Sequence, residues 1–332
     1  KDVNSLGHGA QRSIQMTLIR HLADLKLAQQ VNRTTTLLLI DEPELYLHPQ
    51  AIEILRNSLT ILSNQGYQVI FTTHSPFMIT QKDVGNTILV RKNDIQGTYK
   101  RTTLKSAIPA IENQAQHQLT LLYSLSNSSN ILFSEKIIIA EGKTENKLIP
   151  VLIENITLKT ILHHKTALVK LDGSGNTKKT MQVLSTMDLP TKAIVDLDFA
   201  MKNGISEGYL QANDPDIIAC QSELANIAVA NNITIGADGW PSKNAHVSAA
   251  EGFSILAQSP NVIQNIQNIC LKFQAHNIWV WKKGTIENHL NLQGKNEAVW
   301  ARFCSDLEAS NLQAHLPDDY QEIENCINWL LQ

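Results

Sequence analysis

Several features that would assign a protein to a narrow class are missing from this sequence. The 332 residues contain four cysteines, and no two of them form a CxxC pair: Cys220, Cys270, Cys304 and Cys326. Such scattered thiols argue against a zinc ribbon and indicate the reduced cysteines of a cytoplasmic protein. No apolar run approaches the roughly 20 residues that a membrane helix requires, and the N-terminus lacks the plan of a signal peptide. We therefore expect a cytoplasmic protein without membrane contact.

A strong charge of either sign is also lacking. Lysine and arginine number 28, aspartate and glutamate number 31, and the formal net charge is −3. This balance provides no global attraction to nucleic acid, so binding of a polyanion requires local basic patches or bound cations. The length is sufficient for about two domains, and the apolar content of 43% is ordinary for a globular protein.

A phosphate-binding loop of the form G-x-x-x-x-G-K-[ST] is missing as well. Residues 142–144 read Gly-Lys-Thr, but the residue five positions before this glycine is Ile137. The match to the last three positions of the loop is therefore due to chance. A second near match, GSGNTKKT at residues 173–180, has Lys178 where the second glycine belongs, so it is at most a backbone anion site.

The first hundred residues contain a strand, a helix and a second strand. The apolar run Leu37–Ile40 ends abruptly in Asp41 and Glu42, and about 30 residues later the stretch YQVIFTTHSP ends at His74. Apolar residues at helical spacing lie between the two strands and stop at Gly66. This order is typical of a parallel unit that presents polar side chains at the carboxyl ends of buried strands.

A second series of strands and helices follows a polar interval. We expect strands in EKIIIAEG, TALVKLDGSGN, TKAIVDLDFA and NIWVWKKG, with helices between the first three and a further helix from about Thr285. The interval 203–272 is weakly patterned, and we interpret it as a mostly helical insertion. The alternation of strand and helix predicts an α/β domain with a parallel sheet.

Carboxylates follow these strands. Glu141 ends the first strand, Gly142 permits a sharp turn, and Glu145 lies one helical turn later. Further acids and one lysine stand at the other strand ends: Asp196 and Asp198, which point to the same side, and Glu287 four residues after Lys283. Because the carboxyl ends of parallel strands meet at one edge of a sheet, these acids should converge there. Crowded carboxylates are stabilised by a divalent cation such as Mg²⁺, and a lysine there can offset charge on a transferred phosphate.

The prediction of a metal site depends on the whole set of acids. An isolated Asp-x-Asp pair is common on protein surfaces and binds a metal in a minority of cases. Asp172 also follows a strand, but the sequence Asp-Gly-Ser-Gly is equally typical of a plain turn.

The stretches IIIAEGKTE, LVKLDGSGN, AIVDLD and KKGTIE together resemble the TOPRIM domain of the overcoming lysogenization defect (OLD) nucleases, over roughly residues 134–295. The resemblance implies a two-metal DNA nuclease that uses Mg²⁺ or Mn²⁺. It implies that Glu141, Glu145, Asp196, Asp198 and Glu287 hold the cations, that Glu141 is also catalytic, and that Lys283 assists the transition state.

The stretches LLLIDEPELYLHP and VIFTTHSP resemble the Walker B strand and switch histidine of ABC-type ATPases. The resemblance implies that Asp41 organises the Mg²⁺ of a bound ATP, that Glu42 polarises the attacking water, and that His74 contacts the γ-phosphate. The alternative is a buried strand with solvated acids.

The N-terminal stretch NSLGHGAQRSIQ resembles the signature loop of the same ATPases, in which Ser5, Gly7 and Gly9 contact a nucleotide held by another protomer. The spacing to Gln11 is one residue longer than the commonest form, and an ordinary turn before an amphipathic helix remains the alternative. Since the chain begins at Lys1 without methionine and lacks a P-loop, we expect that an N-terminal portion is missing.

These resemblances imply an α/β architecture. An ABC-ATPase-like lobe is expected over residues 1–100, a helical linker over 101–133, and a TOPRIM domain with a parallel, Rossmann-like sheet over 134–332, with the insertion at about 203–272. They imply a DNA endonuclease regulated by an ATPase, a homo-oligomer formed through the ATPase domain, and a role in defence against phage with a possible additional protein or nucleic acid.

An ATP-driven clamp or sensor that binds metal or nucleic acid without cleaving it is the alternative function. A topoisomerase is disfavoured, because none of the six tyrosines stands in a recognisable nucleophile context, and a primase is disfavoured by the lack of a zinc module.

Overall fold

The computed structural model describes residues 6–7, 9–11, 13–14, 17–18, 21, 36–80, 82–95, 97–107, 128–171 and 177–332. The described residues divide into two compact units. The first unit comprises those up to Thr87 together with Ser128–Phe133, and the second comprises those from Ile88 onward apart from that helix. The hairpin at residues 90–100, which the sequence interpretation assigned to the ATPase lobe, clusters with the second unit.

The first unit contains two parallel strands covered by a helix. Strand β1 (Thr36–Ile40) pairs with β2 (Tyr67–Phe71), and α2 (Pro49–Asn64) connects them, as the sequence predicted. Helix α2 begins with Pro49 at its first position, where the missing N–H costs nothing, and Gly66 follows its end at a φ of 92°. Its buried side chains pack on the inner face of the two strands: Ile52, Leu55, Leu59 and Leu62.

Short elements complete the first unit. The 3₁₀ turns η2 (Pro76–Met78) and η3 (Val84–Asn86) follow β2, and helix α5 (Ser128–Phe133) contacts η2. Near the N-terminus, residues 9–11, 13–14, 17–18 and 21 are helical.

The second unit is built on a parallel sheet of four strands. These are β5 (Lys136–Ala140), β6 (Thr166–Lys170), β7 (Thr191–Val195) and β10 (Ile278–Val280), in the order β6-β5-β7-β10. All four are strands that the sequence predicted, and the apolar side chains of β5 are buried on both faces.

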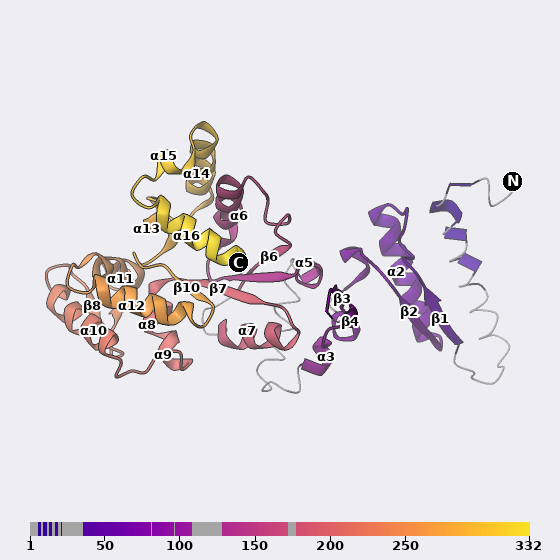
Figure 1. Cartoon of the computed structure of the whole chain (residues 1–332), viewed down its shortest axis with the longest axis horizontal. Helices are drawn as coiled ribbons and strands as arrows, with labels where there is room; N and C mark the ends of the chain where they lie inside the picture. Colours follow the sequence, from indigo (N-terminus) through magenta and orange to yellow (C-terminus); the bar gives the residue numbers. More distant parts are fainter. Residues whose placement is uncertain are drawn as a thin grey trace. The chain divides into compact units, whose positions relative to one another are not determined.

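From β5 the chain passes to β6 on one side of β5, and from β6 it crosses back to β7 on the other side. Helix α6 (Lys143–Thr157) connects β5 to β6, and α7 (Thr177–Thr186) connects β6 to β7, which lies beyond β5. Because such crossovers are right-handed, connections that run in opposite directions cover opposite faces of the sheet. Figure 1 shows α6 with α14 (Glu297–Ala309) and α16 (Tyr320–Leu331) on one side and α7 on the other. The strand order therefore reverses between β5 and β7, where a crevice at the carboxyl ends is expected.

The interval between β7 and β10 is mostly helical, in agreement with the sequence prediction. It contains α8 (Leu197–Met201), α9 (Asn203–Ser206), α10 (Pro215–Ala228), α11 (Ala249–Gln258), α12 (Ile263–Gln274) and a small hairpin of β8 (Thr234–Ile235) and β9 (Pro241–Ser242). Helix α12 packs against both α10 and β10. The insertion thus continues the core on the α7 side of the sheet.

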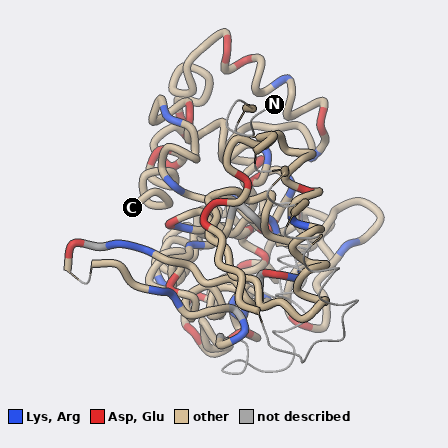
Figure 2. Tube along the Cα trace, turned by 90° about the vertical axis from the view of Figure 1, so that its right-hand side faces the viewer, with Lys and Arg blue, Asp and Glu red and all other residues tan. Residues whose placement is uncertain are grey.

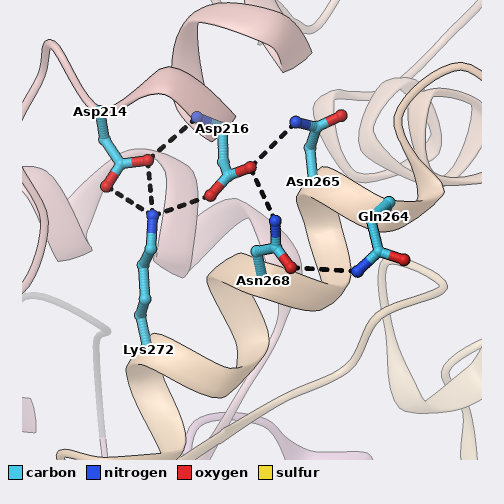
Figure 3. A network of polar contacts seen from close by, with 6 residues as sticks. All are labelled: Asp214, Asp216, Gln264, Asn265, Asn268 and Lys272. Atoms are coloured by element: carbon cyan, nitrogen blue, oxygen red, sulfur yellow. Dashed lines mark hydrogen bonds and ion pairs between the residues drawn. The ribbon is translucent and has the colours of Figure 1, made fainter.

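A polar network joins α10 to α12 (Figure 3). The Lys272 ammonium lies 2.7 Å from both carboxylate oxygens of Asp214 and 2.8 Å from Asp216 Oδ2. The side-chain amides of Asn265 and Asn268 donate to Asp216 Oδ1 at 2.9 and 3.1 Å. These bonds hold the pKa of Asp216 below its ordinary value despite its burial. The network is a structural clamp between two helices.

The remaining elements are short. Strands β3 (Val90–Asn93) and β4 (Gly97–Lys100) form an antiparallel hairpin, followed by α3 (Leu104–Ala107). The helix expected from Thr285 is a single turn, α13 (Ile286–His289), and α15 (Leu312–His315) is equally short. In the described ranges no helix is long and apolar enough to cross a membrane. Figure 2 shows lysine and arginine interspersed with aspartate and glutamate along the described trace.

Candidate metal centre

Glu141 and Asp196 meet at the carboxyl ends of neighbouring strands. Ala140 of β5 pairs with Ile194 of β7, so the residues that follow each strand lie side by side. The Asp196 backbone N–H donates to Glu141 Oε2 at 3.3 Å. Both acids therefore stand at the reversal point of the strand order, the position that the sequence predicted for them.

Glu145 lies in the first turn of α6, and its carboxylate folds back over the start of the helix. A side chain on Gly142 would place a Cβ atom 2.3 Å from Glu145 Oε2. The backbone at Gly142 is extended, with φ −105° and ψ 171°, so other residues could adopt it. This backbone therefore does not need the conformational freedom of glycine that the sequence interpretation assumed, and a larger residue here would displace the end of the Glu145 side chain.

Glu287 reaches the same edge from the corner after β10. It lies in α13, is 5% exposed, and its Oε1 accepts a hydrogen bond of 2.5 Å from the Thr144 hydroxyl on α6. The corner depends on Gly284, which has a φ of 103° and would place a Cβ 2.5 Å from Ser254 Oγ. The hydrogen bond between Thr144 and Glu287 links α13 to the start of α6.

Lys295 supplies the positive charge among these acids. Its Nζ lies 3.1 Å from Glu287 Oε2 and 3.6 Å from Asp196 Oδ2. The charges of Asp196 and Glu287 raise the pKa of Lys295, although burial opposes them. Sequence analysis missed Lys295, because it lies in an irregular segment eight positions after Glu287 and belongs to none of the recognised motifs.

Burial, together with the charges of neighbouring acids, raises the pKa of three of these carboxyl groups. Burial raises the pKa of Glu141 to about 8, and the charge of Asp198 adds to this effect. Burial raises the pKa of Glu145 to about 7, and the charge of Glu287 acts in the same direction. Burial together with the charge of Glu145 raises the pKa of Asp196 well above its ordinary value. The five acids Glu141, Glu145, Asp196, Asp198 and Glu287 are referred to below as the carboxylate cluster.

The donor atoms of the carboxylate cluster fit a hard divalent cation. All are oxygens, which Mg²⁺ and Mn²⁺ prefer, and Asp196 Oδ1 is buried without a hydrogen-bond partner. In the described ranges, however, no three His, Cys, Asp or Glu side chains converge as a ready-made metal site. The Lys295 ammonium lies between Asp196 and Glu287, so one positive charge already holds these two acids near a common point.

Asp198, a member of the cluster, and Lys283 also form bonds outside it. The Asp198 carboxylate lies in the first turn of α8 and accepts a hydrogen bond from the Phe199 backbone N–H at 2.8 Å. The Lys283 ammonium pairs with Asp319 at 2.7 Å, and the Lys283 backbone N–H donates to the buried His289 ring at 3.3 Å. Among the lysines that the structure describes, Lys295 rather than Lys283 forms the ion pairs with the carboxylate cluster.

The first unit brings together the residues predicted to handle ATP. Glu42 Oε1 lies 3.5 Å from His74 Nε2, and the Thr72 hydroxyl donates to Asp41 Oδ1. The Glu42 backbone N–H donates to the same Thr72 oxygen at 3.0 Å, and Glu42 has a φ of 40°, which is uncommon for this residue type. Sequence analysis missed Thr72, whose place at the end of β2 is the signal that could have revealed it.

The predicted signature loop is described in part. Gly9 lies against the segment after β1, because a Cβ there would be 3.2 Å from the Tyr46 carbonyl oxygen, whereas Gly7 has open space around it. Ser5 lies outside the described residues.

Two segments of the chain match known domain families. Residues 2–79 match an AAA ATPase domain, and residues 132–198 match the TOPRIM domain of overcoming lysogenization defect protein-like proteins. The pair of domains that the sequence motifs predict is confirmed, and assignment of the ATPase to the ABC type stays a prediction.

The chain is also similar to a protein named Old nuclease, from Escherichia phage P2. The identity is 33% over 341 residues, which cover 99% of this chain and 56% of the phage protein. The chain thus spans a little over half the length of this curated relative.

Proposed function

Since this chain carries an AAA ATPase domain and a TOPRIM domain of the overcoming lysogenization defect type, we propose that it is a metal-dependent DNA endonuclease whose activity the ATPase domain controls. The observation that carries the proposal is the carboxylate cluster itself. Three separate segments of the chain bring acids to the reversal point of the sheet, where two of them share the Lys295 ammonium.

The proposed metal ligands are the five members of the carboxylate cluster. Bound Mg²⁺ or Mn²⁺ ions would supply Lewis acidity, which activates water and stabilises charge on phosphate oxygens. The Thr144 hydroxyl orients the Glu287 carboxylate, and Gly142 leaves room for that of Glu145. Both side chains are thereby positioned before a cation or substrate arrives.

This proposal gives Glu141 a catalytic role and places positive charge at the site through Lys283 and Lys295. In it, Glu141 is a catalytic residue as well as a metal ligand. We assign the compensation of phosphate charge to Lys283, as the sequence predicted, whereas Lys295 forms the ion pairs with Asp196 and Glu287. Comparison of variants at the two lysines would decide between them.

The ATPase assignments extend the proposal. In it, Asp41 organises the Mg²⁺ of ATP, Glu42 polarises the attacking water, His74 contacts the γ-phosphate, and the segment Ser5–Gly9 contacts the nucleotide of a second protomer. The hydrogen bonds of Thr72 to Asp41 and to the Glu42 backbone support this, because they orient both acids. A homo-oligomer formed through the ATPase domain and a role in defence against phage belong to the same proposal.

The test is nicking of supercoiled DNA with Mg²⁺ or Mn²⁺. The double variant Asp196→Ala, Asp198→Ala is expected to lose about 100-fold or more of the activity. The matched control replaces Glu297 and Glu308 by alanine, two exposed acids on α14, and should retain activity. Nicking by the Asp196, Asp198 variant at the wild-type rate would reject the catalytic assignment of the carboxylate cluster. Loss of biological activity on substitution of Glu42, with none on substitution of Asp198, would favour a clamp or sensor that binds DNA without cleaving it.

A further inference from the structure

The corner between β10 and α13 holds Lys283 at its backbone and at its side chain. The Lys283 backbone N–H donates to His289 Nε2 at 3.3 Å, and its backbone carbonyl accepts from the Asn288 side-chain amide at 2.6 Å. The Lys283 ammonium lies 2.7 Å from Asp319 Oδ2. The N–H, the carbonyl and the ammonium group of this one lysine thus each have a different side chain as partner.

The hydrogen bonds of His289 determine which of its ring nitrogens carries the proton. A backbone N–H can only donate, so Nε2 is the acceptor and the proton of the neutral ring is on Nδ1. His289 Nδ1 lies 2.9 Å from Asp319 Oδ1 and therefore donates to it. The two oxygens of Asp319 thus have separate partners, since Oδ1 accepts from His289 and Oδ2 accepts from Lys283.

Asp319 is a buried carboxylate whose orientation these two bonds fix. Although burial opposes them, the hydrogen bonds from His289 and Lys283 hold the pKa of Asp319 below its ordinary value. The stem of a lysine is long and flexible, so an ammonium group without a partner adopts many positions. Asp319 therefore restricts the positions that are open to the Lys283 ammonium, which lowers the entropic cost of using it at one place.

The Lys283 ammonium remains accessible to a ligand. An ammonium group has three N–H donors, and Asp319 accepts one of them. The Lys283 side chain is 44% exposed, whereas the Asp319 side chain is 6% exposed. Asp319 thus holds the ammonium group from its buried side and leaves donors on the exposed side for phosphate oxygens.

The corner that carries Lys283 is also bonded to the carboxylate cluster. The backbone N–H of Leu197, which separates the two aspartates of the cluster in the sequence, donates to the Gly284 carbonyl at 2.8 Å. Helix α13 carries Glu287 of the cluster and, two residues later, His289. The backbone of Lys283 therefore has a defined position relative to the proposed metal ligands.

We propose that Asp319, held by His289, is a positioning residue that places the Lys283 ammonium for its role at the phosphate. The inference rests on the proposed function, in which Lys283 compensates phosphate charge. The alternative is a purely structural link, because Asp319 precedes the first turn of α16, and Glu322 in that turn pairs with Lys282 at 2.5 Å. This neighbouring ion pair provides the matched control, since Glu322→Gln weakens the attachment of α16 to the same corner and leaves the partners of Lys283 in place.

The first test is the kinetics of nicking of supercoiled DNA with Mn²⁺. Asp319→Asn should lower kcat about tenfold and change KM by less than about twofold, because Lys283 acts on charge that develops in the transition state. In the Lys283→Met background the same substitution should cause no further loss, since a residue that acts through Lys283 has no effect without it. Glu322→Gln should retain the wild-type rate. His289→Phe, which removes the N–H donor to Asp319 and keeps a ring, is a second variant with an expected loss of about threefold or more.

The second test does not depend on nuclease activity. Limited acetylation of the protein in EDTA, followed by mass spectrometry of its peptides, measures how readily the Lys283 amine reacts. Asp319→Asn should raise the rate of acetylation of Lys283 roughly threefold, because the ammonium group loses its ion-pair partner. Lys147, an exposed lysine on α6, should be acetylated at the same rate in both proteins.

The outcomes separate this inference from the proposed function. A lower kcat in Asp319→Asn that disappears in the Lys283→Met background, with faster acetylation of Lys283, supports the inference in variants that circular dichroism shows to be folded. Wild-type nicking by Asp319→Asn alongside loss of activity in Lys283→Met would overturn it and leave the proposed function intact. Equal losses in Asp319→Asn and Glu322→Gln, a further loss in the Lys283→Met background, or unchanged acetylation of Lys283 would do the same. Absence of nicking by the wild-type protein would overturn both.

Discussion

The ammonium nitrogen of Lys295 lies 3.1 Å from the Glu287 carboxylate, and the same nitrogen lies 3.6 Å from Asp196. Two acids that are far apart in the sequence thus share one positive charge at the reversal point of the sheet. A buried pair of like charges is stabilised by such compensation, because the two carboxylates otherwise repel each other. In the proposed function, Lys295 therefore stands between two of the proposed metal ligands.

Removal of this ammonium should favour divalent cations. Lys295→Met is expected to raise the affinity for Mn²⁺ roughly three- to tenfold, because the metal no longer competes with a fixed positive charge that is partly screened by solvent. The same variant should melt at a lower temperature in EDTA, since the carboxylates lose their partner. Calorimetric titration with Mn²⁺ and thermal melts measure both effects. Lys147→Met serves as the control, and an affinity at or below that of wild type would contradict this role of Lys295.

Addition of a single methyl group at Gly142 should disturb the metal site. In Gly142→Ala the new Cβ would lie 2.3 Å from Glu145 Oε2, so the carboxylate has to move. We expect Mn²⁺ affinity to fall about tenfold or more, with a loss of about 1 kcal/mol or less in the free energy of unfolding, because alanine adopts this backbone readily. Gly85→Ala, at a position with open space, should leave Mn²⁺ binding unchanged. Equal Mn²⁺ affinity of the two variants would show that the Glu145 carboxylate is not a ligand.

The stability of the metal-free chain should decrease as the pH rises. Glu141 and Glu145 have pKa values of about 8 and about 7 in the folded protein, against an ordinary value of 4.5. Between these values the folded state binds more protons than the unfolded state, so the free energy of unfolding falls with increasing pH. Urea unfolding in EDTA from pH 5 to pH 8.5 measures the slope, and Glu141→Gln should flatten it. Mn²⁺ should reverse the trend, because its binding requires the ionised carboxylates. A stability that rises over this pH range in EDTA would contradict the assignment.

Much of the carboxylate cluster could be predicted from the sequence, because the patterns that specify it lie within short stretches of the chain. An apolar run of four or five residues that ends in an acid specifies both a buried strand and the edge at which the acid emerges, as for Glu141 and Asp196. Lys295 could not be predicted in this way. It lies in an irregular segment, and only the packing of α13 and α6 brings it to the acids.

The role of Gly142 and the position of the hairpin illustrate the same limit. A glycine after a strand is typical of a turn, yet here the extended backbone is ordinary, and the atoms nearest to position 142 belong to the Glu145 side chain three residues later. The hairpin of β3 and β4 follows the first unit in sequence but clusters with the second, which depends on tertiary contacts such as the hydrogen bond from Arg91 to the Ser134 carbonyl. Neither contact leaves a periodic signal.

The clamp between α10 and α12 should contribute to stability and not to metal binding (Figure 3). In Lys272→Met the carboxylates of Asp214 and Asp216 lose their common partner, and we expect a loss of about 1 kcal/mol in the free energy of unfolding after allowance for solvent screening of the partly exposed lysine. Mn²⁺ affinity should remain within about twofold of wild type. Urea unfolding and calorimetric titration test these two expectations, with Lys243→Met as the surface control. A selective loss of Mn²⁺ affinity in Lys272→Met would show that the insertion controls the metal site.

Anomalous diffraction from crystals of this chain soaked in Mn²⁺ tests directly whether the carboxylate cluster holds divalent cations. We expect a manganese peak in contact with carboxylate oxygens of Asp196 and Glu287, with the Lys295 ammonium displaced from its present position between them. A map without a peak at this edge of the sheet, in which Lys295 still bridges the two acids at saturating Mn²⁺, would contradict it.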